Sequence, residues 1–277
     1  MDTAEPILDT QLAPPRPDDA PLAHGFTVGA VISKTVSVWW RHLLPFTLMS
    51  IVVYAPFATT FGVFFGTLTT GGAAPPPETF LTYGIVMAIV WLLTIVLGVV
   101  QAGAVTYGAV RHLSGERARL GEMLRAGFRR GLPVVGVGLL LWLGVVLGLF
   151  LLVVPGVLLM VASCVAVPAA VVERPGVLGA IRRSFALTKG HRGALFATGF
   201  VILLIVWVLA AVVQVGATVL ATALLPPQRA AVGIVVAGQL GNIFFSALPL
   251  IGISVAYHEL RVEKEGVDTA ALARVFE

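Results

Sequence analysis

LPVVGVGLLLWLGVVLGLFLLVVPGVLLMVASCVAVPAAVV at residues 132–172, followed by ERPGVLGAIRRSFALTKGHR at residues 173–192, decides the fold class of this chain. The first segment contains no Asp, Glu, Lys, Arg or His, and Pro155 with Gly156 divides it into two apolar runs. An apolar run of about 20 residues is long enough to cross the hydrocarbon core of a bilayer as a helix. The stretch therefore predicts a transmembrane hairpin, and the basic segment after it predicts a return to water.

The rest of the chain repeats this alternation. With 58% hydrophobic residues, 12% charged residues and a mean hydropathy of +0.97, the 277-residue chain is too apolar for an ordinary soluble domain. Six runs lack Asp, Glu, Lys, Arg and His altogether, at residues 43–65, 80–105, 132–153, 157–172, 194–225 and 230–257. We expect an all-α, polytopic membrane protein with six transmembrane helices. The fourth run is short and contains Pro168, so we expect local thinning of the bilayer, a kink in that span or its partial burial within the bundle.

The basic residues are distributed unevenly between the gaps. Seventeen of the 18 lie in alternate gaps between the runs, and only Arg229 lies in one of the remaining gaps. Because loops rich in Lys and Arg are retained on the cytoplasmic side, the pattern predicts that both termini are cytoplasmic. The excess of Arg over Lys and the single Asn, Asn242, resemble the composition of a high-GC bacterial genome. We therefore expect a multi-pass protein of the bacterial cytoplasmic (inner) membrane.

Three regions follow from this pattern. Residues 1–23 are acidic and rich in proline, which favours a disordered tail. Residues 24–260 are expected to form the six-helix membrane domain, and residues 261–277 a cytoplasmic C-terminal tail.

Amphipathic patterns precede the first, third and fifth apolar runs. At residues 26–40, apolar side chains recur at spacings of three and four, with Lys34 available for the water side. Similar patterns at residues 120–130 and 177–185 each include paired arginines. They predict three helices that lie in the cytoplasmic interface. Each would begin one copy of a helix-plus-hairpin repeat, although a shared topology would also generate such similarity.

The apolar runs offer little chemistry. Their deeply placed polar residues include Gln101, Gln214, Gln239 and Asn242. Such side chains either line a path for a neutral substrate or hydrogen-bond between helices as packing contacts. His258-Glu259 is not half of a zinc-protease motif, because position 262 is Val rather than His. We expect no catalytic residue, no metal site, no cofactor and no enzymatic activity.

The segment at residues 173–192 concentrates basic residues beside the membrane. Four of them are candidates for binding a lipid headgroup: Arg182, Arg183, Lys189 and Arg192. The alternative is that these side chains only orient the protein and anchor it in the interface. The formal charge is +4, but no nucleic-acid-binding motif accompanies it, so anionic lipid is the expected partner and nucleic acid is not.

Several short motifs lie in and around these segments. They are Trp39-Trp40-Arg41-His42, Pro155-Gly156, Pro168 with Glu173, Arg183-Ser184, Leu187-Thr188-Lys189-Gly190, Tyr257-His258-Glu259-Leu260-Arg261-Val262 and Lys264-Glu265-Gly266-Val267-Asp268. In these motifs the chain resembles the membrane domain of glycerophosphoryl diester phosphodiesterases and related stand-alone bacterial membrane proteins of unknown function. The resemblance implies a six-helix bundle with cytoplasmic interfacial helices. It implies no catalysis, because in those enzymes the reaction belongs to a separate barrel domain, which we expect to be absent here.

Two functional hypotheses follow. The first is a non-catalytic integral membrane protein that contacts anionic lipid, or an unidentified protein partner, through a basic cytoplasmic rim. The second is a transporter of a neutral or lipid-like substrate, motivated by the amide side chains inside the apolar runs. Mutual pairing of those amides, with no cavity beside them, would argue against the transporter.

Overall fold

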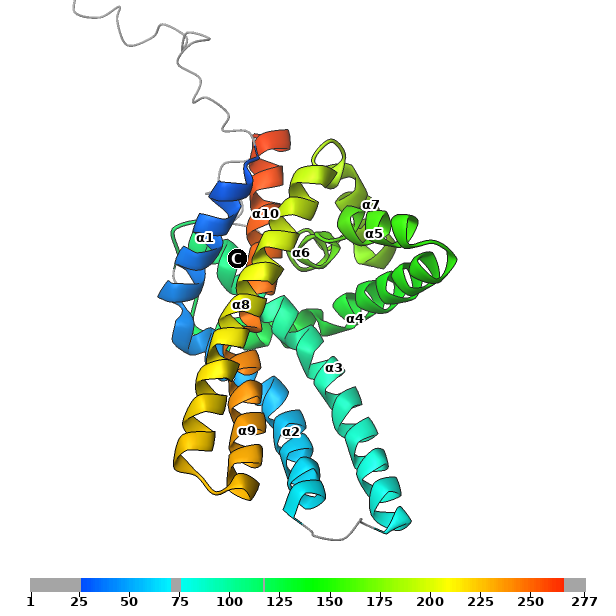
Figure 1. Cartoon of the computed structure of the whole chain (residues 1–277). Coiled ribbons are helices and arrows are strands. Elements are labelled where there is room, and N and C mark those ends of the chain that lie inside the picture. Colours follow the sequence, from blue (N-terminus) through cyan, green and yellow to red (C-terminus); the bar gives the residue numbers. More distant parts are fainter. Residues whose placement is uncertain (1–25, 71–75, 117, 267–277) are drawn as a thin grey trace, which may run out of the picture.

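The computed structural model describes residues 26–70, 76–116 and 118–266, and all regular elements within these ranges are α-helices (Figure 1). The helices are α1 (Val28–Arg41), α2 (Leu43–Thr70), α3 (Pro77–Leu113), α4 (Leu120–Leu151), α5 (Val153–Ala162), α6 (Ala166–Val172), α7 (Gly176–Thr188), α8 (Arg192–Leu224), α9 (Pro227–Phe245) and α10 (Ala247–Glu265). Six helical segments are long and apolar enough to cross a membrane. The expected all-α, polytopic membrane fold is therefore confirmed. The expected tail at residues 1–23 lies outside the described residues.

The alternate basic gaps meet at one end of the bundle. Lys34 of α1 pairs with Glu259 of α10 at 2.6 Å, and Arg183 of α7 pairs with Glu265 of α10. In Figure 1, α1, α7 and the end of α10 lie in the upper part, while the last residues of α2, the first residues of α3 and the turn between α8 and α9 lie at the bottom. The α4–α5 hairpin points to the side in this view. We call the end where the basic gaps meet the basic end.

The fourth span is broken rather than merely kinked. α5 ends at Ala162 and α6 begins at Ala166. Pro168 explains the break, because it has no N–H to donate to the fourth residue before it and its ring would clash with that residue's carbonyl group. The carbonyl oxygen of Ala162 accepts hydrogen bonds from Ser184 Oγ at 2.9 Å and Thr188 Oγ1 at 3.1 Å. Two hydroxyl groups of α7 thus satisfy backbone that the break has freed, as a low-dielectric environment requires.

Two of the three expected interfacial helices are separate elements, namely α1 and α7. The expectation of a separate second one is wrong, because residues 120–130 form the first turns of the continuous helix α4. α4 packs closely on α3 in this region, and a Cβ atom added to Gly127 would lie 2.4 Å from the carbonyl oxygen of Val100. This close backbone contact holds the first turns in line with the apolar part of α4, so only the first and third hairpins have a separate entry helix.

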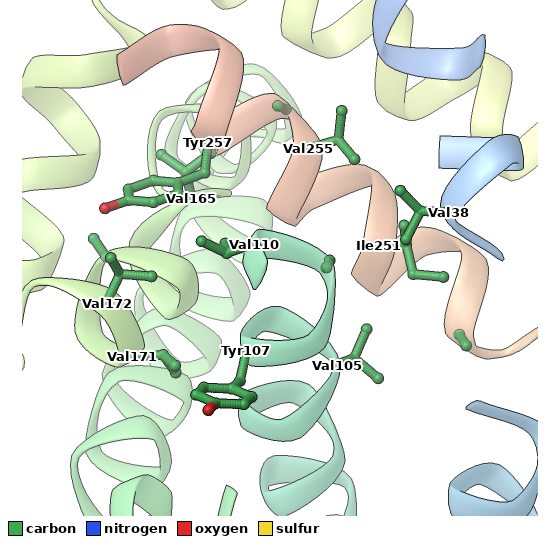
Figure 2. Packing of buried hydrophobic residues seen from close by; sticks show 14 of the residues in the cluster. Val38, Val105, Tyr107, Val110, Val165, Val171, Val172, Ile251, Val255 and Tyr257 are labelled. Atoms are coloured by element: carbon green, nitrogen blue, oxygen red, sulfur yellow. The ribbon is translucent and has the colours of Figure 1, made fainter. Parts of the chain in front are cut away.

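Buried side chains concentrate in the half of the bundle near the basic end. In α3 they run from Val100 to Val110, whereas α10 is buried along much of its length from Ala247 to Leu260. Figure 2 shows valines of α3 and α6 packed beside Val255 and Tyr257 of α10. α10 remains helical to Glu265, beyond the expected domain boundary at residue 260. α3, α6 and α10 therefore form a packed frame that positions the polar groups of the basic end.

Candidate functional site

The first turns of α4 present arginines on one side of the helix. Arg125 and Arg129 are four residues apart, so their side chains lie above one another on the helix surface. Glu122 contributes to the helix start, because its carboxylate accepts a hydrogen bond from the backbone N–H of Arg119 at 3.4 Å. The amphipathic pattern of this segment thus places its charges beside α3 and the α6–α7 turn.

A cavity of about 630 Å³ lies among these three elements, within the usual size range of ligand sites. Its lining consists of Tyr107, Arg111, Glu122, Arg125, Ala126, Arg129, Arg130, Pro133, Ala170, Arg174 and Gly176. Five arginines face a single glutamate, so the cavity carries a strong excess of positive charge. We call it the arginine pocket.

Arg111 pairs with the acidic groups near the pocket. Its guanidinium donates hydrogen bonds to the hydroxyl of Tyr107 at 2.9 Å and to the carboxylate of Glu116 at 2.5 Å. It also pairs with Glu122, the lone glutamate of the lining, at 3.4 Å. The acidic groups here are therefore already engaged with one arginine.

Three other arginines of the lining are exposed: Arg125, Arg129 and Arg174. None of them makes a hydrogen bond or an ion pair with any residue that the structure describes. We call them the pocket arginines. Guanidinium groups match phosphate and carboxylate oxygens with paired N–H donors, so this arrangement is suited to binding an anion.

The backbone of Arg174 is unusual. Its φ of 56° makes it the one non-glycine residue with a left-handed conformation among the described residues. A side chain held in this region costs about 1–3 kcal/mol, and such strain tends to occur at functional sites. Arg174 begins the turn that continues through Pro175 and Gly176, which has a φ of 76°. The strained turn adds a guanidinium from outside α4 to those that α4 supplies.

Apolar surface adjoins the pocket on α4. Phe128 is 66% exposed and Leu132 is 84% exposed, next to Arg129 along the helix. Pro133, one residue further, lines the pocket itself. A ligand that joins an anionic group to an apolar chain would therefore find a partner for each part.

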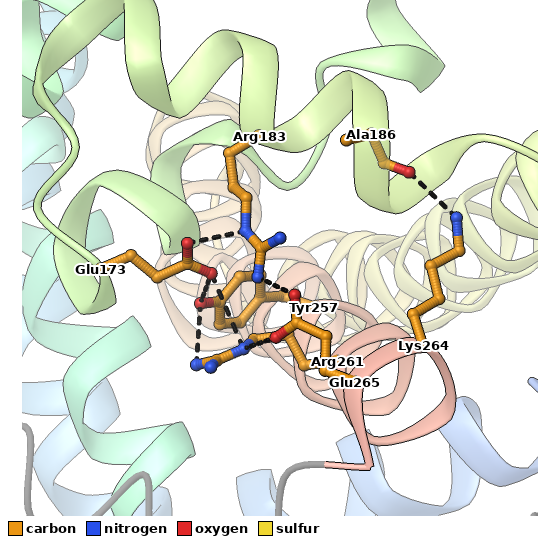
Figure 3. Close-up of polar contacts among 7 residues, drawn as sticks. All are labelled: Glu173, Arg183, Ala186, Tyr257, Arg261, Lys264 and Glu265. Carbon is orange, nitrogen blue, oxygen red and sulfur yellow. Dashed lines mark hydrogen bonds and ion pairs between the residues drawn. The ribbon is translucent and has the colours of Figure 1, made fainter.

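A second arginine cluster joins α7 to α10 (Figure 3). Arg183 donates to Glu173 at 2.7 Å and pairs with Glu265, while Arg261 donates to Glu265 at 3.0 Å. The Tyr257 hydroxyl donates to the other oxygen of Glu173 at 2.7 Å. We call these five residues the clasp. Two arginines meet two glutamates, so the charges balance within the protein.

The clasp also fixes the charge of its members. Burial disfavours the charged form of Arg183, but the neighbouring Glu173 and Glu265 outweigh it and raise the pKa of Arg183 above its ordinary value. Lys264 extends the contact, because its ammonium group donates to the backbone carbonyls of Ala186 at 2.9 Å and Lys189 at 2.6 Å, near the end of α7. α10 therefore holds α7 both through the side chain of Arg183 and through backbone carbonyls near the C-terminal end of α7.

The four basic residues singled out at 173–192 do not share one site. Arg183 belongs to the clasp, whereas Arg182 and Lys189 are exposed. The guanidinium carbon of Arg192 lies 5.9 Å from the ring centroid of Phe185. None of the four lines the arginine pocket.

The four amide residues of the spans are also separated. Gln101 Nε2 donates to Ser50 Oγ at 2.8 Å, and Gln214 Nε2 donates to the carbonyl of Ile234 at 3.2 Å. Gln239 and Asn242 instead line a cavity of about 280 Å³. One residue is thus paired across helices, one is bonded to backbone and two face a cavity, so no single path contains all four.

The pocket arginines were present in the sequence only as members of two basic gaps. The available signal was the amphipathic segment at residues 120–130, whose arginines follow a helical spacing. Arg174 follows the break between α5 and α6 and lines the same pocket, although no local sequence pattern relates it to the arginines of α4.

Across the described residues, no group of three or more His, Cys, Asp or Glu side chains is placed to hold a metal ion. No family model, curated protein or solved structure matches the chain. The geometry of the two arginine clusters is therefore the basis for assigning a function.

Proposed function

We propose that this chain is a non-catalytic integral membrane protein of the bacterial cytoplasmic membrane that binds the anionic headgroup of a lipid in the arginine pocket. The observation that carries the proposal is the set of three pocket arginines without a partner among the described residues, in a cavity of about 630 Å³. The basic end faces the cytoplasm in this proposal, as the distribution of Lys and Arg predicts.

A phosphate group has the chemistry that the pocket lacks. Its oxygens would accept N–H donors from α4 and from the Arg174 turn at once, and its charge would offset the repulsion among the guanidinium groups. Because these side chains are exposed, their attraction to the ligand should weaken as salt screens it.

The surroundings favour a lipid over a soluble phosphate compound. Phe128 and Leu132 expose apolar surface next to the pocket, and a soluble anion would leave that surface unused. The cytoplasmic leaflet of a membrane also supplies anionic lipids at high local concentration. An acyl chain along α4 with its phosphate in the pocket satisfies both kinds of surface.

The test is native mass spectrometry of the purified full chain with dioleoylphosphatidic acid and, as the zwitterionic comparison, dioleoylphosphatidylcholine. We expect preferential retention of the anionic lipid by the natural sequence. The double variant Arg125→Gln, Arg129→Gln should weaken it by at least about tenfold, because hydrogen bonds to charged groups contribute about 1.5–3 kcal/mol each.

The matched control is Arg182→Gln, Lys189→Gln, which removes the same charge from exposed positions outside the pocket. Equal loss in the two double variants would show general attraction to the surface and would refute a specific pocket. Inorganic phosphate, added at constant ionic strength, distinguishes the sources of the ligand. If it displaces phosphatidic acid completely at low millimolar concentration, the site is one for soluble phosphate rather than for lipid.

A further inference from the structure

A second cavity lies inside the membrane-spanning part, and none of its lining residues belongs to the arginine pocket. Its volume is about 280 Å³, and it is lined by residues of α2, α8 and α9 together with Ser246, where α9 meets α10. Gln239 lies about 15 Å along α9 from Arg229, given a rise of about 1.5 Å per residue. Tyr54 lies about 17 Å along α2 from Leu43 on the same basis. The cavity is therefore in the apolar middle of the spans.

Three polar side chains of this lining are without partners. The hydroxyl of Tyr54 and the amides of Gln239 and Asn242 make no hydrogen bond with any residue in the described ranges. In hydrocarbon, an unsatisfied polar group costs several kcal/mol, because no water is present to replace the missing partner. These groups are therefore available to a hydrogen-bonding occupant of the cavity.

A hydrogen-bonded chain of polar side chains ends at the same cavity. Gln101 of α3 does not line the cavity, but it is 2% exposed, and its Nε2 donates to Ser50 Oγ at 2.8 Å. Ser50 Oγ in turn accepts from Ser246 Oγ at 2.9 Å, and Ser246 lines the cavity. The Oε1 atom of Gln101 is buried and lacks a partner among the described residues. A chain of polar groups thus runs from α3 through α2 to the cavity wall.

The lining restricts the charge and the route of an occupant. No Asp, Glu, Lys, Arg or His is among the lining residues, so nothing there would stabilise an ion. Asn242, which lines the cavity, is also exposed on the surface of α9. Because this surface faces the bilayer, an occupant can enter from the lipid phase and leave its acyl chains there.

We propose that this cavity binds the glycerol and ester portion of an uncharged lipid of the diacylglycerol class. The hydroxyl of such a lipid can donate to an amide oxygen, and its ester carbonyls can accept from the amide N–H groups and from Tyr54. A volume of about 280 Å³ holds that polar portion and not the acyl chains. The proposal does not depend on the arginine pocket.

The experiment measures retention of 1,2-dioctanoylglycerol by the purified full chain in native mass spectrometry. We expect the natural sequence to retain one molecule. The double variant Gln239→Leu, Asn242→Leu should reduce retention at least tenfold, because it removes both amide groups. Leucine is similar in size to the replaced side chains and is apolar, so it is compatible with a lipid environment. No retention by the natural sequence would overturn the proposal, as would unchanged retention by the double variant.

Two controls make these outcomes specific. Thr94→Val removes a hydroxyl inside α3 that bonds only to its own helix, at the carbonyl of Val90, and should leave retention unchanged. A loss as large as that of the double variant would show a general effect on the bundle and overturn the site. Arg125→Gln, Arg129→Gln should also leave dioctanoylglycerol retention unchanged, so the two binding sites fail or succeed separately.

Discussion

The clasp and the arginine pocket both collect arginines at the basic end, yet they differ in charge balance. In the clasp, each arginine faces carboxylates within about 3 Å, and the side chains of Glu173 and Arg183 are 20% and 27% exposed. In the pocket, the pocket arginines are exposed and have no carboxylate partner among the described residues. The same residue type is therefore neutralised within the chain in one place and has no carboxylate partner among the described residues in the other.

This difference separates stability from binding. Clasp residues contribute to folding without any ligand, because their partners belong to the chain. If the pocket binds an anion as proposed, its residues contribute through that ligand, and a bound ligand stabilises the folded state according to its concentration and affinity. Variants in the two clusters should therefore respond differently to added lipid.

The largest effect is expected in the clasp. Glu173→Ala removes one of the two carboxylate partners of Arg183 and the carboxylate that accepts from the Tyr257 hydroxyl. Breaking a buried ion pair costs about 3–5 kcal/mol, and because these side chains are partly exposed we expect a loss of about 2–3 kcal/mol. Thermal unfolding in detergent would measure it, with the exposed Glu78→Ala as control. Equal melting temperatures for the two variants would contradict the structural role of the clasp.

Lipid-dependent stability is the next effect. Dioleoylphosphatidic acid at about 100 times its Kd should stabilise the natural sequence by about 2.7 kcal/mol. Arg125→Gln, Arg129→Gln should lose most of this gain while its stability without lipid stays the same or rises, since like charges are removed. A ligand-free protein that is markedly less stable would instead assign these arginines a structural role.

Variants of Arg174 separate the stability of the ligand-free protein from the binding of phosphatidic acid. Arg174→Gly should stabilise the ligand-free protein by about 1–2 kcal/mol, because glycine adopts a positive φ without the steric cost of a Cβ. The same change should weaken binding of phosphatidic acid. Arg174→Gln, which keeps the strain, should weaken binding without the gain in stability; a gain in both variants would show that charge, not backbone strain, causes it.

The smallest effect concerns pH. His42 Nε2 lies 2.9 Å from His112 Nδ1, and burial together with the charge of Arg41 lowers the pKa of His42 below 6.5. Between that lowered value and 6.5, the unfolded chain binds more protons than the folded one, so stability is full above pH 6.5 and falls as the pH falls through this window. We expect a small loss of stability, visible as a lower melting temperature at pH 5 than at pH 7. His42→Asn should flatten this dependence, and an unchanged slope would contradict the assignment to His42.

Particular elements show how far the sequence could lead. The six spans followed from long runs without charge, because hydrocarbon excludes unpaired ions and backbone outside helices. α1 and α7 followed from their amphipathic spacing, whereas the continuity of α4 did not. That continuity depends on the contact between Gly127 and the backbone of α3, which joins residues that no local pattern relates.

The sequence by itself determined the membrane class, the positions of the spans and the concentration of basic residues in alternate gaps, since these depend on local composition and transfer to lipid. Only the tertiary structure decided which arginines are neutralised. Arg183 meets Glu265 across 82 positions of the chain, and Arg174, which follows the broken fourth span, lines the same pocket as Arg125 and Arg129 of α4. Electrostatic pairing depends on distances between side chains, and those distances are fixed by helix packing rather than by the order of residues.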